Sequence, residues 1–140
     1  VASDEQEVTA VTTNEAQAPA RDESVDEELE KARQAFEEFL KQHANDDRTD
    51  QAQFHLGEIH YKEGKWVSGI FDFRKVIKNY PDSDLKPEAT YQIGVGFLNL
   101  KKCDKAKPFF ETVVADYGNS PQAPKAQTKL DAIKRGECGK

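Results

Sequence analysis

The sequence repeats itself at an interval of 37 residues, and this internal repeat restricts the possible fold more than any other feature. When residues 52–83 are aligned with residues 89–120, seven positions are identical. A period of about 20–50 residues is typical of proteins that stack one supersecondary unit on the next. The chain is therefore expected to form a stack of similar units. The identical pairs are Ala52/Ala89, Gly57/Gly94, Lys65/Lys102, Phe73/Phe110, Val76/Val113, Tyr80/Tyr117 and Ser83/Ser120.

Each unit shows the spacing of amphipathic helices. Apolar residues recur with a helical period along three segments that start at residues 29, 66 and 103. A second helix is expected before two of them, over residues 50–63 and 87–100, and a last apolar stripe runs through Ala123, Ala126, Leu130 and Ile133. The pattern predicts an all-α fold of about six antiparallel helices, namely a half repeat, two full repeats and a capping helix.

Acidic residues are concentrated at the N-terminus. Residues 1–28 hold nine acids and one base, a balance of −8, whereas residues 29–140 hold 17 acids and 19 bases, a balance of +2. We expect residues 1–24 to form an acidic, disordered tail or linker, because they carry few large apolar side chains. The helical domain is expected over residues 25–137, and residues 138–140 form the C-terminal end. The charge balance argues against a nucleic-acid partner, and no apolar run reaches the roughly 20 residues that span a bilayer.

The helix pairs resemble the tetratricopeptide repeat. In that repeat small residues stand at the eighth and twentieth positions, where two helices cross too closely for a long side chain. The matching residues are Gly57 and Gly94 at the eighth position, Gly69 and Ala106 at the twentieth, Phe73 and Phe110 at the twenty-fourth, and Pro81 at the thirty-second. Gly118 departs from the proline of the thirty-second position. The resemblance implies a solenoid of stacked helices that binds other proteins.

The period of 37 residues and the segments FHLGEIHYKEGKW, VIKNYPDSD and VVADYGNSP resemble the bacterial cell-envelope branch of this repeat family. Over residues 29–137 the pattern is similar to the C-terminal domain of the periplasmic cell-division coordinators associated with the Tol–Pal system. This resemblance implies a non-catalytic scaffold in the periplasm, or at the outer membrane, of a Gram-negative bacterium. Its partners would be envelope proteins that act in outer-membrane constriction and peptidoglycan synthesis. The alternative is a subunit of an outer-membrane protein assembly or secretion complex.

Self-association is a further expectation. Residues 1–28 lack the heptads of the coiled-coil segment through which such coordinators form trimers. Formation of trimers by that route is therefore not expected.

The sequence carries no signature of an enzyme. It contains no glycine-rich phosphate loop, no G-x-S-x-G elbow and no H-E-x-x-H motif. His55 and His60 are five residues apart and so lie on different faces of a helix, and His55 with Glu58 supplies only two ligands for a metal. We therefore expect no catalytic site, no cofactor and no metal.

The first helices of the two full repeats predict a groove for a peptide or partner protein. In the repeat family the fifth, ninth and twelfth positions face the concave surface. Large amphipathic side chains there can anchor a partner, although the same residues can instead pack against the neighbouring repeat. The candidate groove residues are Phe54, Glu58, Tyr61, Tyr91, Val95 and Leu98. A clamp for a terminal carboxylate is not expected, because no Lys and Asn stand at the fifth and ninth positions.

The two cysteines are candidates for a disulfide. Cys103 opens the second helix of the last full repeat and Cys138 follows the capping helix. Consecutive helices run antiparallel, so the start of one lies beside the end of the next, and a rise of about 1.5 Å per residue leaves a mismatch of only about 4–5 Å. A Cys103–Cys138 disulfide suits an oxidising periplasm. The alternative is that Cys103 is a small core residue and Cys138 a free surface thiol.

Overall fold

The computed structural model describes residues 23–44, 46 and 48–138. Over these residues the chain forms six α-helices and no strand, which confirms the prediction of an all-α repeat fold. No helix in this part of the chain is both long and apolar enough to cross a membrane. The helices are α3 (Glu23–Gln42), α4 (Thr49–Lys62), α5 (Trp66–Asn79), α6 (Lys86–Asn99), α7 (Cys103–Asp116) and α8 (Gln122–Lys134).

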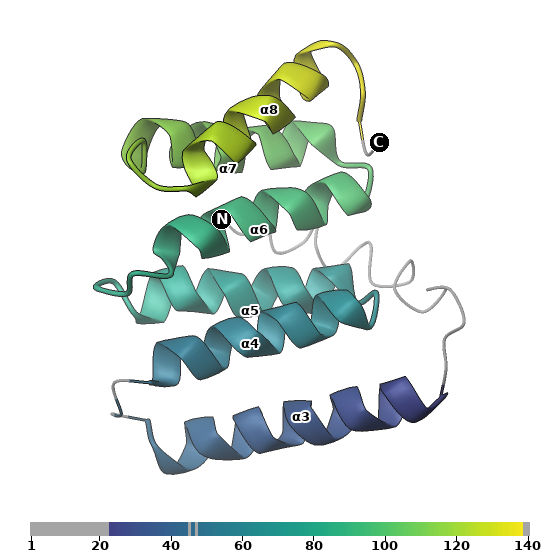
Figure 1. Ribbon diagram of the computed structural model, residues 1–140, viewed down its shortest axis with the longest axis vertical. Helices are drawn as coiled ribbons and strands as arrows, with labels where there is room; N and C mark the ends of the chain where they lie inside the picture. The colour runs from purple at the N-terminus through teal and green to yellow at the C-terminus, as the bar shows by residue number, and fades with distance from the viewer. Residues whose placement is uncertain (1–22, 45, 47, 139–140) are drawn as a thin grey trace.

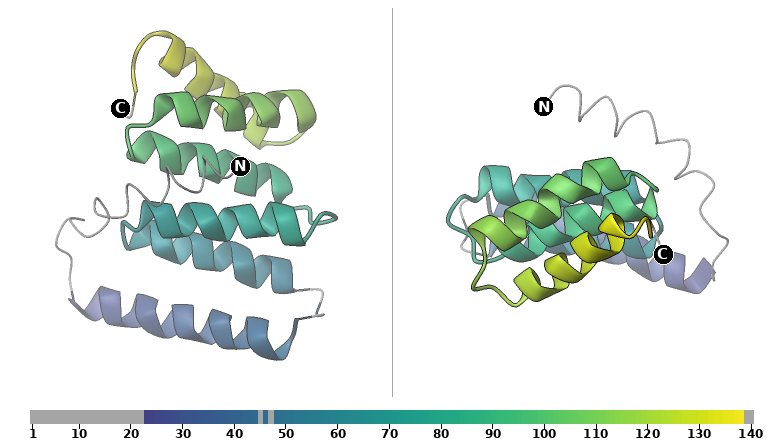
Figure 2. Two further views of the ribbon diagram at one scale, coloured as in Figure 1. Left: turned by 180° about the vertical axis from the view of Figure 1, so that it is seen from behind. Right: turned by 90° about the horizontal axis from the view of Figure 1, so that it is seen from above.

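The helices are stacked in the order of the sequence. Figure 1 shows α3 at one end of the molecule and α8 at the other, with each helix lying across its predecessor. The view along the stack in Figure 2 shows that successive helices cross at an angle. The core follows the stack as one continuous cluster of buried side chains from α4 to α8, with Phe73 and Phe110 fully buried.

The two helices of each full repeat cross at a glycine. In α4, a Cβ atom built on Gly57 would lie 2.7 Å from Cζ of Phe73 in α5. In α6, a Cβ atom on Gly94 would lie 2.7 Å from Cε1 and Cζ of Phe110 in α7. Carbon atoms that are not bonded prefer separations of about 3.5–4.0 Å, so only glycine fits at either crossing. A Cβ atom on Gly69 would likewise collide with the ring of Tyr61.

The turn between the helices of a repeat is the same in both units. Gly64 has φ +77°, and Lys101, which lies 37 residues later, has φ +61°. After α4, Lys65 N–H donates to the His60 carbonyl at 2.8 Å, and after α6, Lys102 N–H donates to the Phe97 carbonyl at 2.9 Å. These bonds belong to the left-handed motif that satisfies the last carbonyls of a helix.

The N-terminal helix is longer than the sequence indicates. α3 begins at Glu23, within the segment 1–24 that we expected to be a tail. The rest of that expectation, residues 1–22, lies outside the described residues, as do residues 139–140 of the C-terminal end. Both remain predictions.

Candidate functional site

The structure places two of the six predicted groove residues in the core. Phe54 of α4 is 6% exposed, and its ring lies 5.0 Å from the ring of Phe73. Leu98 of α6 is 8% exposed. These side chains pack between helices, as the alternative interpretation of the sequence had it, and offer little surface to a partner.

Tyr61 is also held inside the stack. Its hydroxyl donates to the Gln92 carbonyl of α6 at 2.6 Å, and its ring lies 4.9 Å from that of Trp66 and 5.0 Å from that of Phe73. Burial raises the pKa of the Tyr61 phenol well above its usual value, so the hydroxyl stays protonated and keeps its hydrogen bond. The phenol reaches α6 because a side chain is missing there, since a Cβ atom on Gly96 would collide with the Tyr61 hydroxyl. Tyr61 therefore joins two repeats and does not line an open groove.

The other three predicted groove residues remain partly exposed. Tyr91 packs edge-on against Phe110, with ring centroids 5.6 Å apart, and partial burial raises the pKa of its phenol. Glu58 accepts a hydrogen bond from His55 at 2.7 Å, and Val95 is half-buried against the core. A surface formed by Glu58, Tyr91 and Val95 stays a prediction as a binding site.

A cleft lined mostly by apolar side chains lies between α3 and α4. Its volume is about 390 Å³. Arg48 stands over the ring of Phe39, with its guanidinium carbon 5.3 Å from the centroid, and the ring of His55 lies 5.2 Å from that of Phe36. The lining residues are Ala35, Phe36 and Phe39 from α3, Arg48 immediately before α4, and Gln51, Ala52 and His55 from α4. The sequence did not reveal this cleft, because Phe36 lies 37 residues before Phe73 and an equivalent core position is the direct expectation from the repeat.

The charges at the rim of this cleft are paired. Arg48 binds the Asp46 carboxylate with its Nε atom at 3.1 Å and its backbone N–H at 2.9 Å. These hydrogen bonds lower the pKa of Asp46 to about 2. Arg48 is thus already neutralised within the chain.

A second cleft, of about 460 Å³, is mostly polar and lies beside the α5–α6 turn. Ser83 donates to the Asp50 carboxylate across it. Within the described residues, no group of three or more His, Cys, Asp or Glu side chains lies close enough together to hold a metal ion. The lining residues are Ala44, Asp46, Thr49, Asp50, Asn79, Tyr80, Pro81, Asp82 and Ser83.

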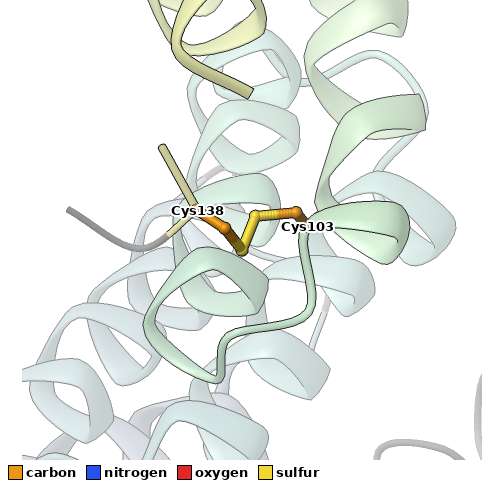
Figure 3. Close-up of a disulfide and its surroundings, with 2 residues drawn as sticks. All are labelled: Cys103 and Cys138. Atoms are coloured by element: carbon orange, nitrogen blue, oxygen red, sulfur yellow. A yellow bond between two sulfur atoms is a disulfide. The ribbon is translucent and has the colours of Figure 1, made fainter. Parts of the chain in front are cut away.

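The structure brings the two cysteines together at the C-terminal end of the stack. The Cα atoms of Cys103 and Cys138 are 5.7 Å apart, and Figure 3 shows their side chains joined between the start of α7 and the segment after α8. This separation lies within the usual range of disulfides, about 4.4–6.8 Å. The formation of the bond in the isolated protein is a prediction that thiol titration tests.

The stacked helix pairs, the glycine crossings and the exposed clefts define a helical-repeat protein of the tetratricopeptide type, a class that uses its extended surfaces to bind other molecules. The model of the YfiO family, described as an outer membrane lipoprotein, matches residues 9–136. The chain belongs to this family, which places it in the cell envelope. No curated protein matches the chain.

Proposed function

We propose that the chain is a non-catalytic module that binds other proteins within an outer-membrane protein assembly complex. The observation that carries this proposal is the match to the outer membrane lipoprotein family YfiO over residues 9–136. The structure supports it with partly exposed apolar side chains on a rigid stack, including Tyr91 and Val95 of α6. Rigid scaffolds with exposed aromatic residues bind partners at a low cost in conformational entropy.

The second candidate is coordination of Tol–Pal-linked constriction of the outer membrane with cell-wall synthesis. The observation that favours it is the similarity of the 37-residue period and of the VIKNYPDSD and VVADYGNSP segments to those coordinators. Both candidates describe an envelope interaction module, and they differ in the partner. The family match favours the assembly complex.

Depletion of the protein in its own bacterium separates the two. If it serves outer-membrane assembly, the amount of folded β-barrel protein in the outer membrane should fall before any defect in division appears. Delayed constriction with normal β-barrel levels would instead support the Tol–Pal role and refute the assembly role. Normal β-barrel levels and normal division after depletion would refute both.

Complementation tests whether the α6 surface takes part. The variant Val95→Lys adds a charge to the surface formed by Glu58, Tyr91 and Val95, and it should restore β-barrel levels poorly. Ala115→Lys, at an exposed position of α7, is the matched control and should restore them fully. Equal restoration by both variants would show that partners bind elsewhere on the stack.

A further inference from the structure

The last helix of the described stack is fully packed only in its first half. In the first half of α8, Ala126 is completely buried. In the second half, Leu130 and Ile133 are only partly buried. By register Leu130 corresponds to Ile93 of α6, which is completely buried. The second half of α8 therefore buries a smaller fraction of its apolar surface than the same part of α6, and hydrophobic burial holds it less strongly.

The contact that secures the equivalent end of the preceding repeat is missing here. In the first full repeat, the ring of Trp66 lies 4.9 Å from that of Tyr61, whose hydroxyl donates to the Gln92 carbonyl of α6 at 2.6 Å. These aromatic residues thus connect the start of α5 with the helix that follows. In the last repeat, Leu98 and Cys103 stand at the positions of the two aromatic residues, so neither the ring contact nor the hydroxyl is present.

The cysteine pair lies at the place of the missing aromatic contact. Cys103 opens α7, and Cys138 follows α8 with its Cα atom 5.7 Å from that of Cys103 (Figure 3). A bond between them closes a covalent ring that contains α7 and α8 and no other described helix. The helices before the ring have a core of their own, since Ile70 and Phe73 of α5 are completely buried. Breaking the bond therefore removes a restraint on α8 and on the segment after it, while α4 and α5 need no cross-link.

Both cysteines can be reached from the solvent. Each is only partly buried, and Arg135 and Gly136 in the segment that leads to Cys138 are exposed. Thiol–disulfide exchange requires that a thiolate approach one of the sulfur atoms, and exposed disulfides exchange more readily than buried ones. The position of the pair therefore suits a bond that a reducing protein can open.

We propose that the Cys103–Cys138 disulfide is a redox switch that holds the second half of α8 on α7, and that its reduction releases residues 130–138 while the rest of the stack stays folded. Release uncovers Leu130 and Ile133 together with the apolar surface on which they pack. This inference goes beyond the proposed function, because it concerns the control of one end of the stack and does not depend on the identity of the partner.

The reductant is a dithiol protein of the thioredoxin class. One of its thiolates attacks a sulfur atom of the disulfide, which gives a mixed disulfide and one cysteine thiolate of this chain. The second thiol of the reductant then attacks the mixed disulfide and releases the other cysteine. The chain gains two electrons and two protons and ends with two thiols, and the reductant leaves with a disulfide.

Reduction of the native protein is the first test. The oxidised full chain is treated with the dithiol dithiothreitol in the absence of denaturant, its free thiols are alkylated, and mass spectrometry counts them. We expect two alkylated cysteines in protein that keeps most of its helical circular dichroism signal, because the bond is accessible and most of the stack does not need it. The double variant Cys103→Ser/Cys138→Ser is the matched control, since it has no bond to break and should not respond to the reductant.

Amide hydrogen exchange followed by mass spectrometry locates the released segment. In the oxidised chain residues 130–137 should be protected, because their amides lie in α8 and its closing turn, where Glu137 N–H donates to the Ala132 carbonyl at 2.9 Å. After reduction these amides should exchange within about tenfold of the rate of an unstructured peptide, while amides of α5 and α6 stay at least about a hundredfold slower than that rate. The double serine variant should match the reduced chain with or without dithiothreitol, and reoxidation of the wild type should restore slow exchange.

Four results would overturn the inference. Protein isolated from an oxidising compartment contains two free thiols, so that no bond forms. Dithiothreitol frees the thiols only in denaturant, so that the bond is closed to exchange. Residues 130–137 keep their protection after reduction, so that packing alone holds α8. Protection is lost in α5 and α6 together with α8, so that the bond supports the whole stack and not one end. The β-barrel levels in depleted cells test the proposed function separately from all four.

Discussion

Replacing Gly94 by leucine tests the helix crossing on which the repeat register depends. An ideal Cβ atom on Gly94 would lie 2.7 Å from Cε1 and Cζ of Phe110 and 3.1 Å from Cδ1. The ring must therefore retreat by about 1 Å to restore normal carbon–carbon contact, before the remaining atoms of the leucine are placed. Phe110 is fully buried and has the ring of Tyr91 packed against it at 5.6 Å, so it has no open space into which to move.

The magnitude follows from two opposing terms. Overpacking of a tight core costs about 1–3 kcal/mol, and the large leucine side chain places this substitution near about 3 kcal/mol. Leucine favours the helix over glycine by about 1 kcal/mol, which offsets part of the cost. The free energy of unfolding should therefore fall by about 2 kcal/mol, and Tm by about 8 °C for a domain of this size.

Urea denaturation and thermal melting followed by circular dichroism measure the effect. Ala115→Leu, which adds a leucine at an exposed site of α7, is the control and should change stability by less than about 0.5 kcal/mol. In the double variant Gly94→Leu/Phe110→Leu the smaller partner leaves room at the crossing. Its loss of stability should therefore be smaller than the sum of the two single losses by about 1 kcal/mol. Wild-type stability of Gly94→Leu, or strictly additive losses, would refute the assigned register.

Three further predictions concern the ends of helices and the contact between repeats. Thiol titration of the unfolded, unreduced protein should find no free thiol. Reduction of the Cys103–Cys138 bond, which spans 35 residues, should lower the free energy of unfolding by about 3–4 kcal/mol in the chain-entropy model. Two free thiols in protein from an oxidising compartment would exclude the bond. Burial raises the pKa of Tyr61 in the folded protein. The contribution of the protonated phenol to folding stability is therefore fully present below the unfolded pKa of about 10, and it is lost as the pH rises from there towards the folded pKa. Tyr61→Phe should flatten this alkaline loss and cost about 1 kcal/mol at neutral pH through the hydrogen bond to Gln92; an unchanged alkaline profile would contradict the assignment. Lys101→Gly should raise stability by about 0.5–1 kcal/mol, because φ is +61° at this residue, and a lower Tm would show that the lysine side chain contributes more than the backbone strain costs.

The fold could be predicted because the same information occurs twice in the sequence. The pairs Gly57/Gly94 and Phe73/Phe110 place the glycine of the helix crossing, and the phenylalanine that packs against it, at the same interval in each unit. Helical stripes then give the helix positions within one or two residues. The early start of α3 at Glu23 was harder to predict, because Val25 is the single apolar residue among four acids and a serine in residues 23–28.

The burial of the predicted groove residues was harder to predict, because it depends on positions at which the two repeats differ. By register Gly96 is the counterpart of Ile59. This single exchange opens space in α6, into which the phenol of Tyr61 enters. Position within a repeat thus told us that Tyr61 faces the next unit, but not whether it is exposed there. A comparison of the two units, with attention to where a large residue becomes glycine, could have revealed the contact.

The two ends of the stack differ, and the difference determines how a partner can add to it. At the C-terminal end Asp131 occupies the place of the crossing glycines, and Cys138 after α8 lies within disulfide distance of Cys103 at the start of α7. A side chain at the crossing position is expected to obstruct a phenylalanine that packs as Phe73 packs against Gly57. At the other end Phe36 remains partly exposed beside an apolar cleft. The two ends of the described stack therefore present different surfaces, a carboxylate at the crossing position of α8 and a mostly apolar cleft beside α3.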